Sequence, residues 1–278
     1  MLRVLIRPTT FCLTEMQNGQ NPYIDIYHHV NRRSVLAHHH SLEQALTNTI
    51  TYTIDNPDHV LPDIVFTANA GLSLPRLSKT ILLPNMKYKQ RQEELSYLKE
   101  IYRNLHLEMI SYPGKEPFEG QAELKWFHGG TKAVCGYGHR STKKTFHELD
   151  RFFKKIYGIE RAPELLIIPL ASFNYYHLDV AMLEFDDTSC IVHKKAFSAA
   201  SIARLQKFLG AEHVHVIDVT DTFCLNALVD GTHLITHKLT HDVKQILEEI
   251  THRTVQMIDT SEFEKSGGSV RCMTLDIF

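Results

Sequence analysis

The stretch Lys132–Leu170, KAVCGYGHRSTKKTFHELDRFFKKIYGIERAPELLIIPL, carries the pattern from which the fold is predicted. Two short β-type runs, KAVCGYG and ELLIIPL, flank a helical pattern over Phe146–Gly158. Short runs bounded by glycine or proline are typical of strands. The stretch therefore predicts a strand, a helix that ends at Gly158, and a second strand.

The same arrangement recurs along the chain. We predict helices at Ser41–Ile54, Gln90–Leu105, Phe146–Gly158, Ser198–Gly210 and Leu239–Arg253, with Ser41 and Ser198 as N-caps. The runs expected to form strands are LRVLIR, DIVFTANAGL, KTILLPN, LEMISY, KAVCGYG, ELLIIPL, DVAMLEF, SCIVHKKAF, HVHVIDV, NALVDGTHLITH, TVQMID and VRCMTLDIF. The helix centres lie about 40 to 55 residues apart, and a fixed period of this kind indicates a repeat architecture. Five such units closed in a ring would place their strand ends around a central axis, which is where active sites of radial folds lie.

Composition favours an ordinary globular protein. Hydrophobic residues make up 43% of the 278 positions and charged residues 22%. No linker rich in proline, glycine or serine divides the chain, so we expect one domain over residues 1–278. The net charge of −2 argues against a nucleic-acid partner, and no apolar run is long enough for a membrane span.

The cysteines and the N-terminus indicate a cytoplasmic protein. The five cysteines are odd in number, widely spaced and never in CxxC pairs, which argues against disulfides or a cysteine-rich zinc site. The first residues, MLRVLIRPTT, lack the long apolar core of a signal peptide. We expect no metal and no cofactor, and the sequence leaves the formation of a homo-oligomer open.

Four stretches place polar residues where a plain core strand would not need them. They are LPDIVFTANAGL, EPFEGQAELKWF, NYYHLDVAMLEF and GGSVRCMTLDIF, and their polar candidates are Asp63, Asn69, Glu119, Glu123, His177, Asp179 and Cys272. Each also has an ordinary structural interpretation: a strand with a turn, a solvated loop, an edge-strand pair and a small buried residue in a last strand. If His177 and Asp179 lie two apart in one strand, both side chains point to the same face.

Together these residue types supply the parts of a nucleophilic site. A thiol attacks when a base removes its proton or a neighbour stabilises the thiolate. Cys272 is the candidate nucleophile, His177 the base, and Glu119 the group that orients the base. Asp179 would provide a carboxylate for a cationic substrate.

Five motifs carry a resemblance to a known superfamily. FTANAGL, FEGQAE, GYGHRS, YHLD and GGSVRC follow one another along nearly the whole chain, from Asn21–Pro22 onward. In this ordered set the chain resembles the guanidino-group-modifying enzymes, or penteins. These include arginine deiminases, dimethylarginine dimethylaminohydrolases, glycine amidinotransferases and arginine dihydrolases. The resemblance implies a five-bladed α/β propeller with pseudo-fivefold repeats.

The resemblance also implies a role for each candidate. Cys272 matches the nucleophile, His177 the general acid and base, and Glu119 the carboxylate beside the histidine. Asp179 matches the carboxylate that holds the guanidinium. The remaining matches are substrate-binding positions: Arg140 and Arg91 for the substrate carboxylate, and Asn69, Asp63 and Asn21 for the pocket.

Two departures from the superfamily pattern bear on the chemistry. The usual EGxGD reads EGQAE here, with Ala122 for glycine and Glu123 for aspartate, which keeps the charge on a longer side chain. The deiminases use an aspartate where this chain has Asn69. One carboxylate fewer on the guanidinium points towards the dihydrolase-like branch.

The expected function is hydrolysis of the guanidino group of arginine or a related compound through a covalent cysteine intermediate. Deimination gives citrulline, and a dihydrolase continues to ornithine, carbon dioxide and a second ammonia. The alternatives within the class are an amidinotransferase and a dimethylarginine dimethylaminohydrolase. Outside it, a metal-binding protein would use histidines such as His38–His40 or His213 and His215. The local cysteine signature of papain-like proteases is absent.

Overall fold

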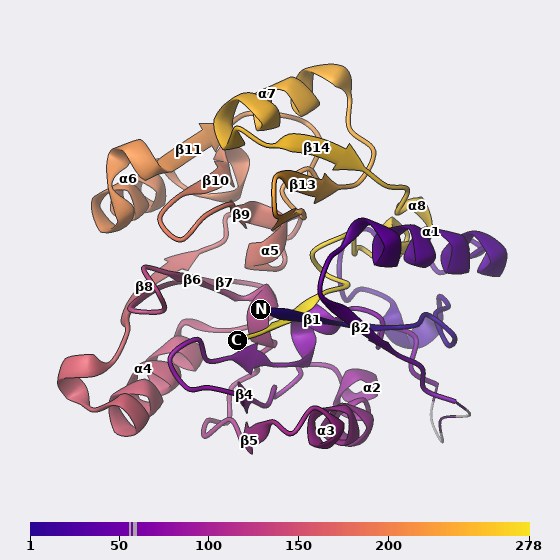
Figure 1. Ribbon diagram of the computed structural model, residues 1–278, viewed down its shortest axis with the longest axis horizontal. Coiled ribbons are helices and arrows are strands. Elements are labelled where there is room, and N and C mark those ends of the chain that lie inside the picture. The colour runs from indigo at the N-terminus through magenta and orange to yellow at the C-terminus, as the bar shows by residue number, and fades with distance from the viewer. Residues whose placement is uncertain (56, 58–59) are drawn as a thin grey trace.

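The computed structural model describes residues 1–55, 57 and 60–278, and within them five three-stranded β-sheets surround the middle of the molecule. Figure 1 shows the five long helices outside the sheets. None of the helices in these described residues is long and apolar enough to cross a lipid bilayer. The periodic arrangement predicted from the sequence is therefore present as five sheet-and-helix units, an α/β architecture.

Every sheet is built in the same way. Its first strand is antiparallel to the middle strand, and a helix then leads to a third strand parallel to the middle one. A parallel pair needs such a crossover, because a short turn cannot reverse the chain twice. Four sheets follow one another in sequence: β3 (Leu72–Ser73), β4 (Thr80–Leu82) and β5 (Glu108–Ile110); β6 (Leu124–Phe127), β7 (Lys132–Tyr137) and β8 (Glu164–Pro169); β9 (Met182–Glu184), β10 (Cys190–His193) and β11 (Val214–Ile217); β12 (Leu228–Asp230), β13 (His233–Thr236) and β14 (Thr254–Met257).

The fifth sheet joins the two ends of the chain. Its strands are β15 (Leu275–Ile277), β1 (Leu2–Ile6) and β2 (Thr49–Tyr52). β15 pairs antiparallel with β1, so the last strand takes the place that a hairpin strand holds in the other sheets. N and C accordingly lie close together in the middle of Figure 1. The crossover helices are α1 (Arg32–Ala45), α2 (Lys89–Gln92) with α3 (Leu95–Asn104), α4 (Lys143–Tyr157), α6 (Ala199–Leu209) and α7 (His241–Thr251).

Each helix packs an apolar face on its own sheet. On α4, Phe146, Leu149 and Phe153 are fully buried with strand residues of the β6–β8 sheet. The predictions for α4 and α6 are confirmed to within a few residues, with Ser198 as the N-cap of α6 and Gly158 and Gly210 at the C-terminal ends. α7 lies within its predicted range, whereas the helix predicted at Gln90–Leu105 is divided into α2 and α3.

The first predicted helix is wrong. α1 begins nine residues earlier than expected, at Arg32, because the Asn31 side chain accepts a hydrogen bond from the Ser34 N–H and caps the helix there. Ser41 is not an N-cap: it lies inside α1 and donates to the carbonyl of Ala37. The range predicted as helix instead continues into β2, whose sequence TITY suits a strand paired with β1. His38–His40 are consequently helical and not in a turn before the helix.

Short turns lead into the first strand of each sheet, and three of them lie in runs that were expected to form continuous strands. They are η2 (Thr67–Ala70), η3 (Gly120–Ala122), α5 (Leu178–Ala181), residues 222–226 and residues 270–273. His177 and Asp179 therefore do not share a strand, and Cys272 lies in a turn before β15. β6 was not predicted as a strand, because its residues belong to the stretch that was interpreted as a loop.

Hydrogen bonds join these turns to one another. The N–H of Ala68 donates to the carbonyl of Cys272, and the N–H of Gln121 donates to that of Gly71. The N–H of Arg271 donates to the carbonyl of Asn226. The turns thus lie next to each other, and side chains that are far apart in the sequence meet there.

Candidate active site

Seven of the ten predicted site residues line one small cavity. It has a volume of about 20 Å³, which is room for roughly one water molecule. The seven are Asn21, Asp63, Asn69, Arg91, Arg140, His177 and Cys272. The other three contact this set directly or through one residue: Glu119 bonds His177, Asp179 bonds Cys272, and Glu123 bonds the backbone of Glu119. The structure therefore brings all ten predicted residues together.

Cys272 is buried, with polar atoms on several sides of its sulfur. Its Sγ lies 3.4 Å from Oδ2 of Asp179 and accepts a hydrogen bond of 3.0 Å from Nδ2 of Asn226. The backbone of Ser269 bonds the same sulfur. Burial raises the pKa of the Cys272 thiol, and the Asp179 carboxylate raises it further. In the unliganded protein the thiol is consequently the favoured form at neutral pH.

His177 and Glu119 form a buried pair. Nε2 of His177 lies 2.8 Å from Oε2 of Glu119, and Nη1 of Arg140 donates to the same oxygen at 2.7 Å. Burial opposes the charge of Glu119, but Arg140 and His177 outweigh it and hold the pKa of that carboxyl well below its usual range. Burial lowers the pKa of His177, so the ring is neutral at neutral pH and able to accept a proton.

Asn69 lies between this pair and Arg91. Its Nδ2 donates to Oε2 of Glu119 at 3.1 Å and lies 3.4 Å from Nε2 of His177. Its Oδ1 accepts a hydrogen bond of 3.0 Å from Nη1 of Arg91. The amide therefore fits a carboxylate on one side and a guanidinium on the other.

Both arginines of the cavity wall are already engaged by protein groups. Arg91 bonds both carboxylate oxygens of Glu94 and the carbonyls of Asp63 and Phe66, besides Asn69. Arg140 bonds Glu119 and the carbonyl of Gln20, and its guanidinium lies about 5 Å from the rings of both Tyr88 and Tyr176. An arginine has five N–H donors, and Arg140 has more of them left for a ligand than Arg91 has.

Asp63, Asn21 and Glu123 have partners within the protein. Asp63 accepts hydrogen bonds from Gln17 and Ser266, and the Asn21 amide bonds the carbonyl of Ser266. Glu123 accepts the backbone N–H of Glu119 at 2.9 Å and lies behind Glu119, outside the cavity wall. Burial, followed by the charge of Glu119, raises the pKa of Glu123 to about 8.

The glycine pair before Cys272 allows close packing against the cavity wall. Gly267 has a φ of 86°, in the region that favours glycine, and a Cβ there would lie 2.6 Å from Oδ1 of Asn21. A Cβ on Gly268 would lie 2.1 Å from the ring of Phe66. Tyr176 donates its hydroxyl to the carbonyl of Gly267. These glycines therefore give the nucleophile turn a tight, fixed path.

Asp179 is the buried carboxylate beside the candidate nucleophile. Its side chain is fully buried, and its Oδ1 has no hydrogen-bond partner in the described part of the chain. Among the described residues, neither of its oxygens forms an ion pair. A buried carboxylate of this kind is costly unless a cation binds it. A guanidinium paired with this carboxylate would lie beside Cys272.

Sequence reasoning missed several residues around the site. Asn226 bonds the candidate nucleophile, and Gln17, Tyr176 and Ser266 bond its neighbours. The signal for Asn226 is its place in FCLNALVD, since it lies two residues before the first strand of its repeat, much as Asn69 lies three residues before the first strand in FTANAGL. The others lie in irregular loops, where no periodicity marks them.

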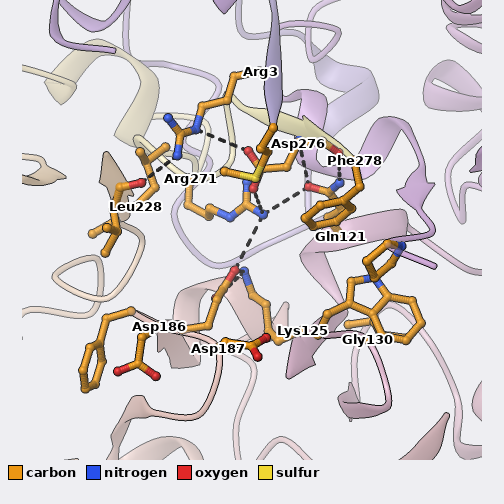
Figure 2. A pocket seen from close by; sticks show the side chains of 18 of the residues that line it. Arg3, Gln121, Lys125, Gly130, Asp186, Asp187, Leu228, Arg271, Asp276 and Phe278 are labelled. Atoms are coloured by element: carbon orange, nitrogen blue, oxygen red, sulfur yellow. Dashed lines mark hydrogen bonds and ion pairs between the residues drawn. The ribbon is translucent and has the colours of Figure 1, made fainter. Parts of the chain in front are cut away.

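A larger pocket of about 530 Å³ shares no lining residue with this cavity. Figure 2 shows Arg3, Arg271, Asp276 and Lys125 in its wall. Arg3 and Arg271 pair with Asp276, and Nζ of Lys125 pairs with Glu184 at 3.0 Å. This pocket contains no cysteine, and its buried cations already have carboxylate partners, so it is not the candidate active site.

The histidines proposed as metal ligands lie apart from the cavity. His39 is buried in α1, His40 pairs with Glu43, and His38 pairs with Asp259. Within the described part of the chain, no group of three or more His, Cys, Asp or Glu side chains is arranged to hold a metal ion.

The sequence is similar to those of several known proteins. The family model described as N,N dimethylarginine dimethylhydrolase, eukaryotic, matches residues 7–278. A bifunctional arginine dihydrolase/ornithine cyclodeaminase, ArgZ of Synechocystis sp., is 25% identical over 85% of this chain and 32% of its own length. The N(G),N(G)-dimethylarginine dimethylaminohydrolase of Mycobacterium tuberculosis is 26% identical over 92% of this chain and 80% of its own length. The chain spans about a third of the length of the bifunctional relatives it matches.

Solved structures share the fold. The product-bound N-terminal domain of ArgZ superposes with a TM-score of 0.85 at 22% identity, over 99% of this chain and 97% of that one. A dimethylarginine dimethylaminohydrolase adduct with S-methyl-L-thiocitrulline gives a TM-score of 0.72 at 14% identity, over 98% of both chains. At these identities the likeness establishes the α/β fold alone.

Proposed function

Since the chain belongs to the eukaryotic N,N dimethylarginine dimethylhydrolase family, we propose that it hydrolyses the guanidino group of arginine or a methylated arginine through a covalent intermediate on Cys272. The observation that carries this proposal is the fully buried Asp179, which has one unpartnered oxygen and another 3.4 Å from the sulfur of Cys272. A guanidinium paired with that carboxylate would hold its carbon against the nucleophile.

The first step is attack by sulfur on the guanidinium carbon. A guanidinium bound at Asp179 offsets the carboxylate charge that raises the pKa of the thiol, so the thiolate forms more readily with substrate present. The thiol proton passes to the neutral His177, whose imidazolium Glu119 stabilises. His177 then protonates the departing nitrogen, which leaves as ammonia or as dimethylamine and leaves a thiouronium adduct on Cys272.

The second step is hydrolysis of that adduct. His177, neutral again after the first departure, takes a proton from water, and the resulting hydroxide attacks the same carbon. The carbon–sulfur bond breaks as the hydroxyl proton of the adduct passes to the sulfur, so that Cys272 is again a thiol and citrulline is released. His177 then gives its proton to solvent. A dihydrolase repeats the attack on the ureido carbon and forms ornithine, carbon dioxide and a second ammonia.

We further propose that the five sheets form a closed five-bladed propeller. The hydrogen bonds between consecutive turns and the pairing of β1 with β15 support this arrangement. The contact of Glu119 with His177 links η3 to α5, and the bond from Asn226 to the carbonyl of Asp179 links α5 to the next turn. The site residues would then come from all five units around one axis.

Two substrate classes fit the proposal. The family model favours a methylated arginine, whereas Asn69 and the matched arginine dihydrolase favour arginine itself with two rounds of hydrolysis. Incubation of the protein with arginine, agmatine and methylated arginines, with products identified by mass, separates them. Release of dimethylamine and citrulline supports the first class, and release of ornithine from arginine supports the second. No turnover of any of these compounds would refute the proposed function.

Amidino transfer to an amine is the alternative reaction at the same site. It keeps the amidino carbon on the cysteine while the rest of the substrate leaves, so the mass of the adduct distinguishes it from hydrolysis. The cytoplasmic location, the single catalytic domain over residues 1–278 and catalysis without metal or cofactor remain predictions.

A further inference from the structure

The side-chain amide of Asn226 contacts both the nucleophile and the backbone that carries it. Its Nδ2 donates to Sγ of Cys272 at 3.0 Å and to the carbonyl of Asp179 at 3.1 Å. Its Oδ1 accepts the backbone N–H groups of Arg271 at 3.0 Å and of Cys272 at 3.2 Å. The side chain is fully buried. All its hydrogen-bonding atoms are therefore used within the site.

The orientation of this amide is fixed by its backbone partners. If the oxygen and nitrogen of Asn226 were exchanged, an NH₂ group would face the N–H groups of Arg271 and Cys272, and an oxygen would face the carbonyl of Asp179. The NH₂ group would then oppose two buried N–H groups and the oxygen would oppose a buried carbonyl, and such unsatisfied contacts are costly. The orientation that satisfies all three backbone groups also directs an N–H towards the sulfur.

The other groups that face the sulfur do not supply a second side-chain donor. Asp179 offers a carboxylate oxygen, and the phenol of Tyr176 and the neutral ring of His177 line the same region. The guanidinium of Arg271 points away, since it bonds Gln121 and Asp276 at the wall of the larger pocket (Figure 2). Among the described residues, two groups donate a hydrogen bond to the sulfur: the backbone of Ser269 and the side chain of Asn226.

We propose that Asn226 is a catalytic residue, whose amide N–H stabilises the Cys272 thiolate while its oxygen holds the turn that carries the cysteine. A hydrogen bond from a neutral donor to an anion is stronger than one to the neutral thiol, so it favours the thiolate. The inference rests on the proposed function for its catalytic meaning, and on the contacts above for its effect on the thiol.

Two variants separate this role from a purely structural one. Asn226→Asp keeps an acceptor for the N–H groups of Arg271 and Cys272 but turns an oxygen towards the sulfur in place of the donor. Asn226→Ala removes both the N–H that donates to the sulfur and the oxygen that accepts the two backbone N–H groups, and it adds no charge. Asn104→Asp, at the exposed C-terminal end of α3, is the matched control for the added charge.

The readout is the pH dependence of Cys272 alkylation by iodoacetamide without substrate, quantified on the Cys272 peptide by mass. We expect alkylation at neutral pH to slow by roughly tenfold to a hundredfold in Asn226→Ala, with the rise in rate moved to higher pH. Asn226→Asp should be slower still, and Asn104→Asp should match the wild type. Near-normal alkylation in Asn226→Asp, or in Asn226→Ala where the aspartate variant fails to fold, would overturn the inference.

Turnover is measured separately, so that the two proposals can fail separately. If the wild type turns over no guanidino compound but the alkylation order holds, the proposed function is refuted while the thiolate contact stands. If the wild type is active and alkylation is unchanged in the variants, the role of Asn226 is refuted while the proposed function stands.

Discussion

Asp179→Asn should change the reactivity of the cysteine and the activity of the enzyme in opposite directions. The sulfur of Cys272 lies 3.4 Å from the carboxylate, and two unit charges at that distance repel by about 5 kcal/mol at an effective dielectric constant of about 20. Removing that charge should lower the thiol pKa and speed alkylation of Cys272 at neutral pH by at least tenfold. The same change removes the anionic partner of the guanidinium. Loss of a buried charge pair costs about 3 to 5 kcal/mol, so kcat/KM should fall by roughly a hundredfold or more.

The assay compares wild type and Asp179→Asn in two measurements on the same preparations. One is the rate of iodoacetamide alkylation at the Cys272 peptide, and the other is product formation from the substrate identified above. A variant in which alkylation and turnover both fall would indicate a disturbed fold, which thermal unfolding would reveal. A folded variant with unchanged alkylation would refute the reasoning that Asp179 sets the thiol pKa. A folded variant with normal turnover would refute its role in binding the guanidinium.

Three further perturbations have defined outcomes. Asn69→Asp places a carboxylate against Glu119 and offers a neutral ureido group no hydrogen-bond donor. The ratio of citrulline to ornithine formed from arginine should therefore rise by about tenfold to a hundredfold. An unchanged ratio would show that Asn69 does not decide the second round of hydrolysis. Gly268→Ala places a Cβ 2.1 Å from the Phe66 ring, so it should lower the free energy of unfolding by about 1 to 3 kcal/mol and reduce activity as well. In the control Gly138→Ala the new Cβ lies 3.5 Å from its nearest neighbour, so neither stability nor activity should change. Burial opposes the charge of His237, but Asp221 and Glu264 raise its pKa to about 9. The charged ring should therefore stabilise the fold fully below about pH 6.5, and the free energy of unfolding should fall by up to about 3 kcal/mol as the pH rises through 9. His237→Asn should flatten that part of the stability profile, and a wild-type profile that is already flat there would contradict the assignment.

The repeat architecture could be predicted because each unit carries a local signal. Helices such as α4 and α6 have capping residues and glycines at their ends, and the strands between them are short apolar runs. The residues of β2 were assigned to a helix because TITY is too short to reveal a period, and only its pairing with β1 makes it a strand. Turns before the first strands were missed because their apolar residues are buried by neighbouring units.

The sequence predicted which residues form the candidate site but not which of them contact one another. The motifs include Cys272, His177, Glu119 and Asp179, and the structure brings them together. Their arrangement depends on turns from separate units, so the sequence did not indicate that Arg140 pairs with Glu119. It likewise did not reveal Asn226, because an asparagine before a strand has no local feature that relates it to a cysteine 46 residues away.

The measurement that tests the central claim most directly is the mass of the covalent adduct on the Cys272 peptide. The wild type is mixed with arginine and with dimethylarginine, quenched in acid during turnover, digested and compared with Cys272→Ser treated in the same way. Hydrolysis through Cys272 predicts a thiouronium adduct with the mass of arginine less ammonia, or of dimethylarginine less dimethylamine, on that peptide. An adduct that carries only the amidino carbon would indicate amidino transfer. An adduct on Cys12, Cys135, Cys190 or Cys224, or an unmodified Cys272 peptide during active turnover of the wild type, would contradict the assignment of Cys272 as nucleophile.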